Sequence, residues 1–275
     1  MATRWVETQA GRMGAIHLGT SGYVYKHWKG LFYPRELPAS RWLPYYARVF
    51  TTVELNAPFY RLPTPAAVDG WREQTPEGFR FAAKGSRYLT HMKRLKEVGE
   101  GLEHYFGVMK RLGPKLGPVL WQLPPQMKKP DPQRLERFLE HLPRDVQHVF
   151  EFRNEAWYQE EVLEVLEHWG AALCEHDLLP VRPSRPTGAF RYLRFHGASA
   201  KYAGRYGPEG LKPVAKDLRR WRRRGGTAWV YFNNDQHGHA LLDAMELAEQ
   251  LGEVEVHPPP EMRNPHPSPS GRGTG

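Results

Sequence analysis

The chain has 275 residues, of which 40% are hydrophobic and 12% aromatic, so it can form a real core and is not a disordered binder. Its single cysteine, Cys174, excludes an internal disulfide framework and a cysteine-rich zinc site. No run has the length of a signal peptide or approaches the roughly 20 apolar residues of a membrane span. We therefore expect a cytoplasmic protein with no membrane partner.

Lys and Arg outnumber Asp and Glu by 39 to 30, which gives a net charge of +9. This balance favours anionic partners, either a small phosphorylated molecule or nucleic acid, although a basic surface can also serve solubility alone. The densest basic run, residues 219–224, ends a segment with a helical pattern, where cations suit the negative end of the helix dipole.

Eight apolar runs with strand character recur along the chain with helical patterns between them. They cover residues 15–19, 52–56, 79–84, 118–123, 148–153, 171–177, 190–197 and 228–235. Thr64 and Asp131, each followed by proline, are helix N-cap signals, and segments 154–170 and 239–252 have helical spacing and end on glycine.

Strands that alternate with helices indicate an α/β protein with a single (β/α)8 TIM barrel, here over residues 15–256. A doubly wound open sheet is the alternative. Residues 1–14 form an N-terminal extension in this interpretation. Residues 257–275 are rich in Pro, Gly and Ser, so we expect a disordered tail there.

Polar residues follow the inner face of these strands late in each run. In 148–153, alternation places Glu151 and Arg153 on one face and Phe150 and Phe152 on the other. The C-terminal rim of a barrel carries the active site, and buried charges there must be paired. The strand ends contribute Glu54, Asn56, Lys84, Gln122, Glu151, Arg153, Glu175, His176, Asp177, Arg194, His196, Asn233, Asn234 and Asp235.

Two of these residues, Glu54 and His196, are the better candidates for proton transfer. Glu151, between Arg153 and Arg194, is expected to be ionised and to orient a ligand. The alternative is a ring that only satisfies its own charges and closes the barrel mouth.

The loops beyond these strands combine aromatic residues with cations, which suits stacking on bases or sugars and pairing with phosphate. Barrels often bind phosphate at the seventh and eighth loops, so Lys201, Tyr202 and Arg205 are candidate anion contacts. The alternative is that the aromatic residues of segment 21–38 pack a lid or an interface.

The strings of the dinucleotide fingerprint, the P-loop, the hydrolase elbow and the zinc proteases are absent, so no nucleotide cofactor is expected. The metal content stays unknown: a divalent ion is conceivable from the acids and histidines of the strand ends, but their spacing shows no tight ligand pair.

Several strings resemble the YecE-like family of bacterial and archaeal proteins, a domain of unknown function. They are LGTSGYVYKHWKGLFYP, TVELNAPFYRLP, FRFAAKGSRYLTH, LGPKLGPVLWQLPP, FEFRNEAW, YLRFHG and VYFNND, spread over residues 15–252. The resemblance implies a TIM barrel with a polar site at its C-terminal rim and adds Tyr60, Arg61 and His91 to the site residues. Tyr23 and Ala57 depart from the family pattern, where Trp and a hydroxyl residue are common.

The leading hypothesis is an enzyme of the hydrolase or phosphodiesterase kind that acts on a nucleotide or a nucleic-acid phosphodiester. Arg153, Arg194, Lys84 and Lys201 would hold the anion. The alternatives are a non-catalytic module that binds nucleic acid or a phosphorylated ligand, and a sugar-processing enzyme that uses Glu54 and Glu151.

Overall fold

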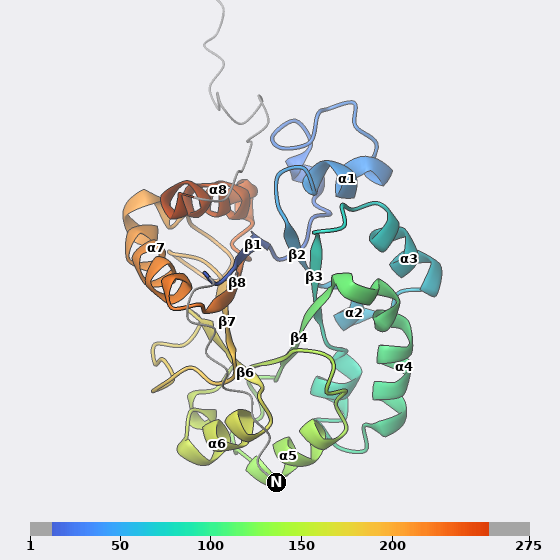
Figure 1. Cartoon of the computed structure of the whole chain (residues 1–275), viewed down its shortest axis with the longest axis vertical. Helices are drawn as coiled ribbons and strands as arrows, with labels where there is room; N and C mark the ends of the chain where they lie inside the picture. Colours follow the sequence, from blue (N-terminus) through green and yellow to red (C-terminus); the bar gives the residue numbers. More distant parts are fainter. Residues whose placement is uncertain (1–12, 253–275) are drawn as a thin grey trace, which may run out of the picture.

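A computed structural model describes residues 13–252 of the chain. Eight parallel strands stand in the order β1-β8-β7-β6-β5-β4-β3-β2, which confirms the predicted (β/α)8 barrel (Figure 1). The strands are β1 (Ile16–Thr20), β2 (Thr52–Leu55), β3 (Arg80–Lys84), β4 (Leu116–Gln122), β5 (His148–Glu151), β6 (Ala172–His176), β7 (Phe190–Phe195) and β8 (Thr227–Phe232). The predicted tail, 257–275, and most of the predicted N-terminal extension lie outside the described residues.

The barrel closes between β1 and β2, where one bridge joins Ser21 to Glu54. Below this bridge the hydroxyl of Tyr46 lies between the strands: it accepts a hydrogen bond from Thr20 N at 3.0 Å and donates one to Thr52 O at 3.1 Å. Gly19 allows the close approach, because a Cβ there would lie 2.2 Å from Thr52 O. A tyrosine hydroxyl thus replaces part of the ladder at the closing seam.

Helices surround the barrel and begin largely where their caps predict. Thr64 accepts from Ala67 N at 3.2 Å and Asp131 from Arg134 N at 2.9 Å, which confirms both predicted starts. The α-helices are α1 (Trp42–Tyr46), α2 (Ala57–Tyr60), α3 (Pro65–Glu73), α4 (Gly99–Met109), α5 (Pro132–Glu140), α6 (Glu160–His168), α7 (Gly207–Arg223) and α8 (His239–Leu251). Short 3-10 or π turns are η1 (Lys26–Trp28), η2 (Ala39–Arg41), η3 (Tyr88–Met92), η4 (Lys110–Lys115), η5 (Glu155–Trp157) and η6 (Gln236–Gly238).

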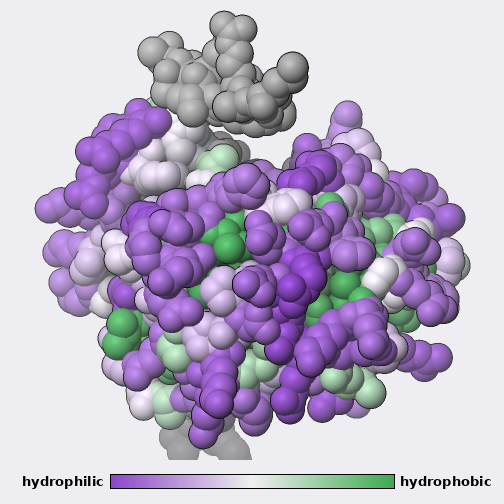
Figure 2. Space-filling view, turned by 90° about the horizontal axis from the view of Figure 1, so that it is seen from below, coloured by the Kyte–Doolittle hydropathy of each residue, from purple (hydrophilic) through white to green (hydrophobic). Residues whose placement is uncertain are grey.

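The regular alternation of strand and helix fails once, between β6 and β7. The connection 177–189 contains no helix and runs as an irregular loop beside α7 (Figure 1). Within residues 13–252 no helix is long and apolar enough to cross a membrane. The face in Figure 2 is mostly hydrophilic, with apolar residues in small separate patches.

The core has two layers, as the strand period requires. Inside the barrel, Val149 packs in a small cluster with residues such as Leu120 and Tyr231. On the outer side, Phe150 packs against Phe138 of α5, with ring centroids 6.0 Å apart. Along a strand, the residue two positions after a member of the inner cluster points to the same side, and at the C-terminal ends of the strands this side is the mouth of the barrel.

Candidate functional site

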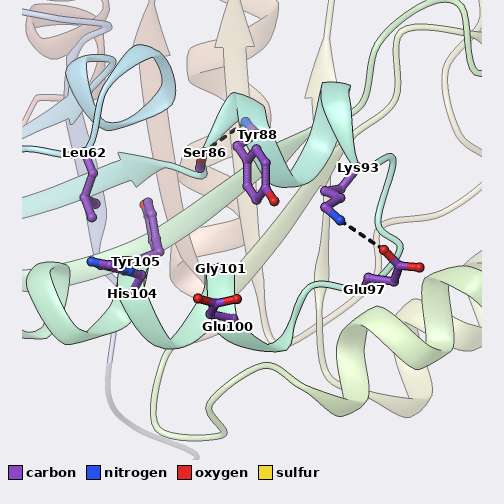
Figure 3. Close-up of a pocket in the computed structure, with 9 residues that line it drawn as sticks. All are labelled: Leu62, Ser86, Tyr88, Lys93, Glu97, Glu100, Gly101, His104 and Tyr105. Carbon is purple, nitrogen blue, oxygen red and sulfur yellow. Dashed lines mark hydrogen bonds and ion pairs between the residues drawn. The ribbon is translucent and has the colours of Figure 1, made fainter.

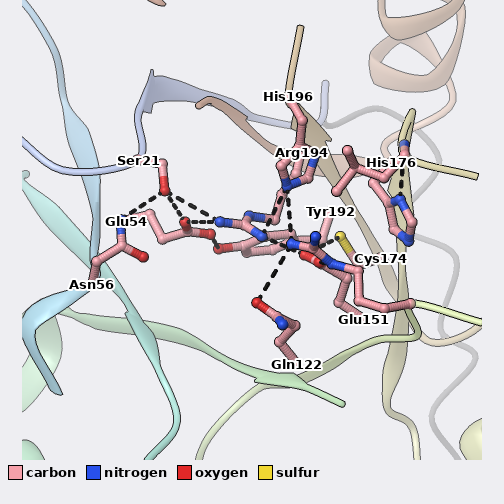
Figure 4. A network of polar contacts seen from close by, with 12 residues as sticks. Ser21, Glu54, Asn56, Gln122, Glu151, Cys174, His176, Tyr192, Arg194 and His196 are labelled. Atoms are coloured by element: carbon pink, nitrogen blue, oxygen red, sulfur yellow. Dashed lines mark hydrogen bonds and ion pairs between the residues drawn. The ribbon is translucent and has the colours of Figure 1, made fainter. Parts of the chain in front are cut away.

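A buried charge network fills the floor of the barrel mouth, with Arg194 of β7 at its centre (Figure 4). One guanidinium nitrogen, Nη2, donates to Glu54 Oε1 of β2 at 2.8 Å, and the other, Nη1, donates to Glu151 Oε2 of β5. Arg194 is 1% exposed and both glutamates are 0% exposed. One cation thus joins two carboxylates from strands on different sides of the barrel.

Both carboxylates have further donors. Glu54 Oε1 also accepts from the Ser21 hydroxyl, and Oε2 accepts from the hydroxyl of Tyr192 at 2.6 Å. Glu151 accepts from Nε of Arg153. Burial raises the pKa of Glu54, but Arg194 and the hydrogen bonds from Ser21 and Tyr192 outweigh it, so the pKa lies below the usual value.

Burial likewise raises the pKa of Glu151, but Arg153 and Arg194 outweigh it and hold the pKa well below the usual value. Both glutamates are therefore ionised at neutral pH, as the sequence predicts for Glu151.

His196 also lies in this network, in its neutral form. Its Nε2 is 3.2 Å from Arg194 Nη1 and 3.3 Å from Arg153 Nη2. Guanidinium nitrogens only donate, so Nε2 accepts and the ring proton is on Nδ1, which lies 3.3 Å from Asp177 Oδ1. Burial lowers the pKa of His196 to about 4, although Asp177 opposes the shift.

These contacts do not support the predicted proton-transfer role of Glu54 and His196. The carboxylate of Glu54 is ionised and accepts hydrogen bonds at both oxygens, and both ring nitrogens of His196 are engaged. Proton transfer needs a group whose pKa lies near the working pH and that can reach a substrate. The geometry places both residues below the mouth as positioning groups.

Above the network lies a mouth cavity of about 460 Å³ with Lys84 of β3 in its wall. Lys84 is 8% exposed, and its amine has no hydrogen-bond or ion-pair partner among residues 13–252; its Nζ lies 4.1 Å from the ring centroid of Phe59. Burial, together with repulsion from Arg194, lowers the pKa of Lys84 to about 7. A buried amine that titrates near neutrality therefore faces this cavity.

Asp235, after β8, is the second group of the mouth cavity with a pKa near neutrality. Its carboxylate accepts from Trp28 Nε1 at 2.9 Å and lies 2.9 Å from His27 Nε2. Burial raises the pKa of Asp235 to about 6. The mouth cavity thus holds one amine and one carboxyl that can both exchange protons at physiological pH.

The structure brings most of the predicted site residues together. Those that line the mouth cavity are Asn56, Tyr60, Lys84, Arg153, Arg194, Tyr202, Asn233 and Asp235. Those in the network of hydrogen bonds next to it are Glu54, Gln122, Glu151, Asp177 and His196. His91 lies at the edge, with its ring 5.1 Å from that of Phe59, whereas Arg61 and Lys201 are exposed and do not line the cavity.

Two polar residues at predicted strand ends, and one predicted anion contact, point elsewhere. Glu175 is on the outer face of β6, where Arg191 donates to it at 2.6 Å. Asn234 donates to Asp243 of α8 at 2.8 Å, and Arg205 pairs with the same carboxylate at 3.2 Å. Arg205 is therefore a support of the loop before α7, and its guanidinium is already paired.

Sequence reasoning missed Ser21 and Tyr192, which both donate to Glu54. Tyr192 is in phase with Arg194 and His196 on β7, so the strand period contains the signal. Ser21 was missed because β1 runs one residue further than predicted, to Thr20. Tyr25 and His27 line the mouth cavity as well.

Most aromatic residues of segment 21–38 pack internally, as the alternative interpretation of this segment expected. Trp28, Phe32 and Tyr33 are fully buried, and the ring of Tyr33 stacks on Trp42 with centroids 4.7 Å apart. In the mouth cavity this segment contributes Tyr25, whose hydroxyl donates to Ser21 O at 2.5 Å. The segment is thus mainly a packed cover over the closing seam.

A second cavity, of about 580 Å³, lies between η3, α4 and Leu62 (Figure 3). Lys93 and Glu97 form an ion pair at 3.0 Å in its wall, and the hydroxyl of Tyr105 donates to Lys84 O at 3.2 Å. Its charged groups are paired or dispersed, so it shows no convergence like that of the mouth cavity.

Donors for a metal ion do not gather in the described part of the chain. Within residues 13–252 no group of three or more His, Cys, Asp and Glu side chains is arranged to hold one. The two central carboxylates, of Glu54 and Glu151, accept from guanidinium groups instead. The residues present therefore do not fit a metal centre, and we derive no step through one.

The fold and the mouth define a (β/α)8-barrel protein with a buried charge network at the end of the barrel where enzymes of this fold carry their active sites. The chain belongs to the family described as "Protein of unknown function DUF72", whose model matches residues 17–268. It is similar to the UPF0759 protein YunF of Bacillus subtilis, with 26% identity over 80% of this chain and 89% of that protein.

It is also similar to the UPF0759 protein YecE of Escherichia coli, with 32% identity over 51% of this chain and 54% of that protein. A crystal structure of a DUF72 family protein of Thermotoga maritima matches with 31% identity and a TM-score of 0.77, over 87% of this chain and 100% of that one. A relative from Enterococcus faecalis, at 20% identity and a TM-score of 0.74, shows the same fold. The predicted YecE-like family is thereby confirmed.

Proposed function

We propose that this protein is an enzyme that acts on a phosphate-bearing substrate, a nucleotide or a nucleic-acid phosphodiester, in the mouth cavity. The observation that carries the proposal is Lys84, a nearly enclosed amine without a hydrogen-bonded counter-ion among the described residues. A buried cation is costly unless an anion pairs with it, and substrate can supply that anion.

The placement of the cations in the mouth also favours an anion. Lys84 and Arg153 line the mouth cavity, whereas the carboxylates of Glu54 and Glu151 are fully buried in the network below it. Arg194 Nε is buried and has no hydrogen-bond partner among residues 13–252. Fixed guanidinium groups in a site of low polarity stabilise the charge that develops on a transferring phosphoryl group.

Tyrosines at the mouth support a substrate with a base or sugar next to its phosphate. Tyr25, Tyr60 and Tyr202 line the mouth cavity, and Tyr60 and Tyr202 are 77% and 41% exposed. Aromatic rings that project into solvent stack on bases with little sequence preference. A nucleotide unit would fill the cavity with its phosphate toward Lys84.

Hydrolysis then uses the two groups that titrate near neutrality. The carboxylate of Asp235 takes a proton from water as the water oxygen bonds to phosphorus. The ammonium group of Lys84 pairs with the phosphate and gives a proton to the leaving oxygen as the bond from phosphorus to that oxygen breaks. Arg153 pairs with the phosphoryl oxygens from the wall of the mouth cavity, where Glu151 holds its guanidinium in place, and Arg194 adds positive charge from the network below.

The network argues against the sugar-processing alternative. A glycosidase needs one protonated carboxylic acid and a second carboxylate on the other side of the scissile bond. Here Glu54 and Glu151 are both ionised and share Arg194. A non-catalytic binding module would use the same cavity and differ only in lacking turnover.

The test is a turnover screen with nucleotides, phosphorylated sugars, single-stranded DNA and DNA with an abasic site, with and without added divalent ions. Lys84→Met keeps the side-chain volume and removes the amine, whereas Lys216→Met removes an exposed amine on α7 as the control. We expect Lys84→Met to lower turnover by about 10²-fold or more and Lys216→Met to leave it unchanged. Tight binding without turnover of any of these substrates would refute the enzyme and favour the module.

A further inference from the structure

The outer wall of the barrel is open between β6 and β7, where no helix covers it. On the other strands the outward residues are mostly apolar and packed under helices, as Phe150 is under α5. On β6 and β7 the outward positions include Glu175 and Arg191 instead. The charged pair lies there because the helix that would bury apolar residues at this place is missing.

A groove of about 390 Å³ runs between the connection 177–189 and the C-terminal half of α7. The residues that line the groove include five arginines and a tryptophan: Arg182, Arg185, Arg191, Arg220, Arg224 and Trp221. Arg220, Trp221 and Arg224 belong to the basic run 219–224, which the mouth cavity does not use. The dipole of α7 explains why cations lie at the C-terminal end of this helix. It does not explain why they line the same groove as Arg182, which belongs to the connection 177–189.

Charges in the groove do not balance. Arg191 donates to Glu175 and Asp217 at 2.6 Å each, and Arg220 donates to the same Asp217. Arg185 pairs with Glu160 and Glu167, at 2.7 and 2.8 Å, on the other side of the connection.

Arg182 and Arg224 are exposed and have no ion pair within residues 13–252. Apart from Arg185, the groove therefore contains four guanidinium groups and the two carboxylates of Glu175 and Asp217. Two positive charges are left for a ligand.

We infer that this groove is a second anion-binding site, separate from the mouth cavity, which binds the phosphates of a single-stranded nucleic acid. Arginine matches phosphate oxygens with two parallel N–H bonds. Trp221 is half-buried in the wall of the groove, with a hydrogen bond from its Nε1 to Thr227 O at 2.9 Å and the guanidinium of Arg191 5.7 Å from its ring centroid, so an ordered aromatic side chain lies beside the arginines for contact with a base.

An acidic peptide fits the groove less well. Peptides that bind to a sheet add a strand to a free edge, and both edges of β6 and of β7 are already paired with neighbouring strands. Pro183 and Pro186 in the other wall offer no backbone N–H group. The groove thus provides side-chain donors and a ring, which are the contacts that a nucleic acid strand uses.

The experiment measures anisotropy of a labelled 12-nucleotide single strand against the full chain over a range of salt. Arg182→Gln combined with Arg224→Gln removes the two unpaired charges, and Arg41→Gln combined with Arg48→Gln removes two exposed charges near α1 as the control. We expect the first pair to raise Kd at least tenfold and to lower the slope of log K against log salt by about 1.4, while the control leaves both unchanged. The Lys84→Met protein should bind the labelled strand with the same Kd and salt slope as the native protein. This result separates the groove from the function proposed for the mouth.

Competition identifies the source of the phosphate. Inorganic phosphate that displaces the strand only at millimolar concentration supports a nucleic-acid site, whereas equal affinity for inorganic phosphate would show a site for the free ion and overturn the assignment. Displacement by poly-glutamate at equal charge concentration would also overturn it. Unchanged strand binding by the doubly substituted protein, with an intact far-UV spectrum, would refute the site itself.

Discussion

Replacement of Arg194 by methionine tests the buried network most directly. The substitution keeps much of the side-chain volume but removes the guanidinium that contacts both Glu54 and Glu151, and all three side chains are at most 1% exposed. Breaking a buried ion pair from one side costs about 3 to 5 kcal/mol, because a charge stays buried without its partner. For a domain of this size each kcal/mol shifts Tm by about 2–4 °C, so the expected fall in Tm is roughly 6 to 20 °C.

The pH dependence gives this prediction its sign. In the native protein the pKa values of Glu54 and Glu151 lie below the ordinary 4.5, so their contribution to stability is present above that pH and is lost as the pH falls through the folded values. In the Arg194→Met protein burial dominates and raises the folded pKa of Glu54. The native state then binds the extra proton, and stability rises as the pH falls from 7 to 5.

Thermal unfolding followed by circular dichroism at pH 5, 6 and 7 measures both effects. The double variant Glu54→Gln with Arg194→Met should be more stable at pH 7 than Arg194→Met alone, because it no longer buries the unpaired charge of Glu54. A single Arg194→Met variant within about 1 kcal/mol of the native protein and with unchanged pH dependence would refute the network as the organising feature of the mouth.

Three further predictions concern single side chains. Lys84→Met should raise Tm at pH 7, and this gain in Tm should shrink toward pH 9.5. The pKa of Lys84 in the folded protein, about 7, lies below that of an unfolded lysine, so the cost of the buried charge is full below pH 7 and falls as the pH rises. Thermal melts of both proteins at pH 7 and pH 9.5 measure the difference. Tyr46→Phe should cost about 1–3 kcal/mol in urea unfolding, because Thr20 N and Thr52 O each lose a hydrogen bond at the closing seam, and a smaller cost would mean that the strands pair directly. Burial raises the pKa of Cys174 well above its usual value, so a thiol reagent should label it only in denaturant, and rapid labelling of the folded protein would contradict the packing inside the barrel.

The fold follows from the sequence because every strand is a compact apolar run and two helices carry explicit N-caps. The period of two also assigns faces correctly in β5, where Glu151 turns inward and Phe150 outward. The same period could not reveal that β6 and β7 lack an intervening helix, since segment 177–189 has no strong pattern of either kind. The charged residues Glu175 and Arg191 at outward positions were the available signal, and the prediction that Glu175 lies at the rim is wrong, because Glu175 points outward and pairs with Arg191.

The composition of the mouth was predictable, but the roles within it were not. Strand order brings Glu54, Glu151 and Arg194 together, and the sequence contains all three at strand ends. What it does not contain is which donor reaches which acceptor. The roles of Glu54 and His196 depend on Arg194, which lies between the two glutamates and beside the imidazole. These contacts have lengths of about 3 Å, and a sequence pattern does not determine positions to that precision.

The network then explains why the pKa of a lysine on β3 lies near neutrality. Arg194 holds Glu54 and Glu151 as anions, and burial keeps His196 neutral against the opposing effect of Asp177, so Glu54, Glu151 and His196 keep their protonation states near pH 7. The guanidinium groups of Arg194 and Arg153 also repel a proton on Lys84, whose amine lies over the ring of Phe59. Fixed charges in the network thus lower the pKa of Lys84, and this amine lies in the wall of the mouth cavity, where the proposed function needs it.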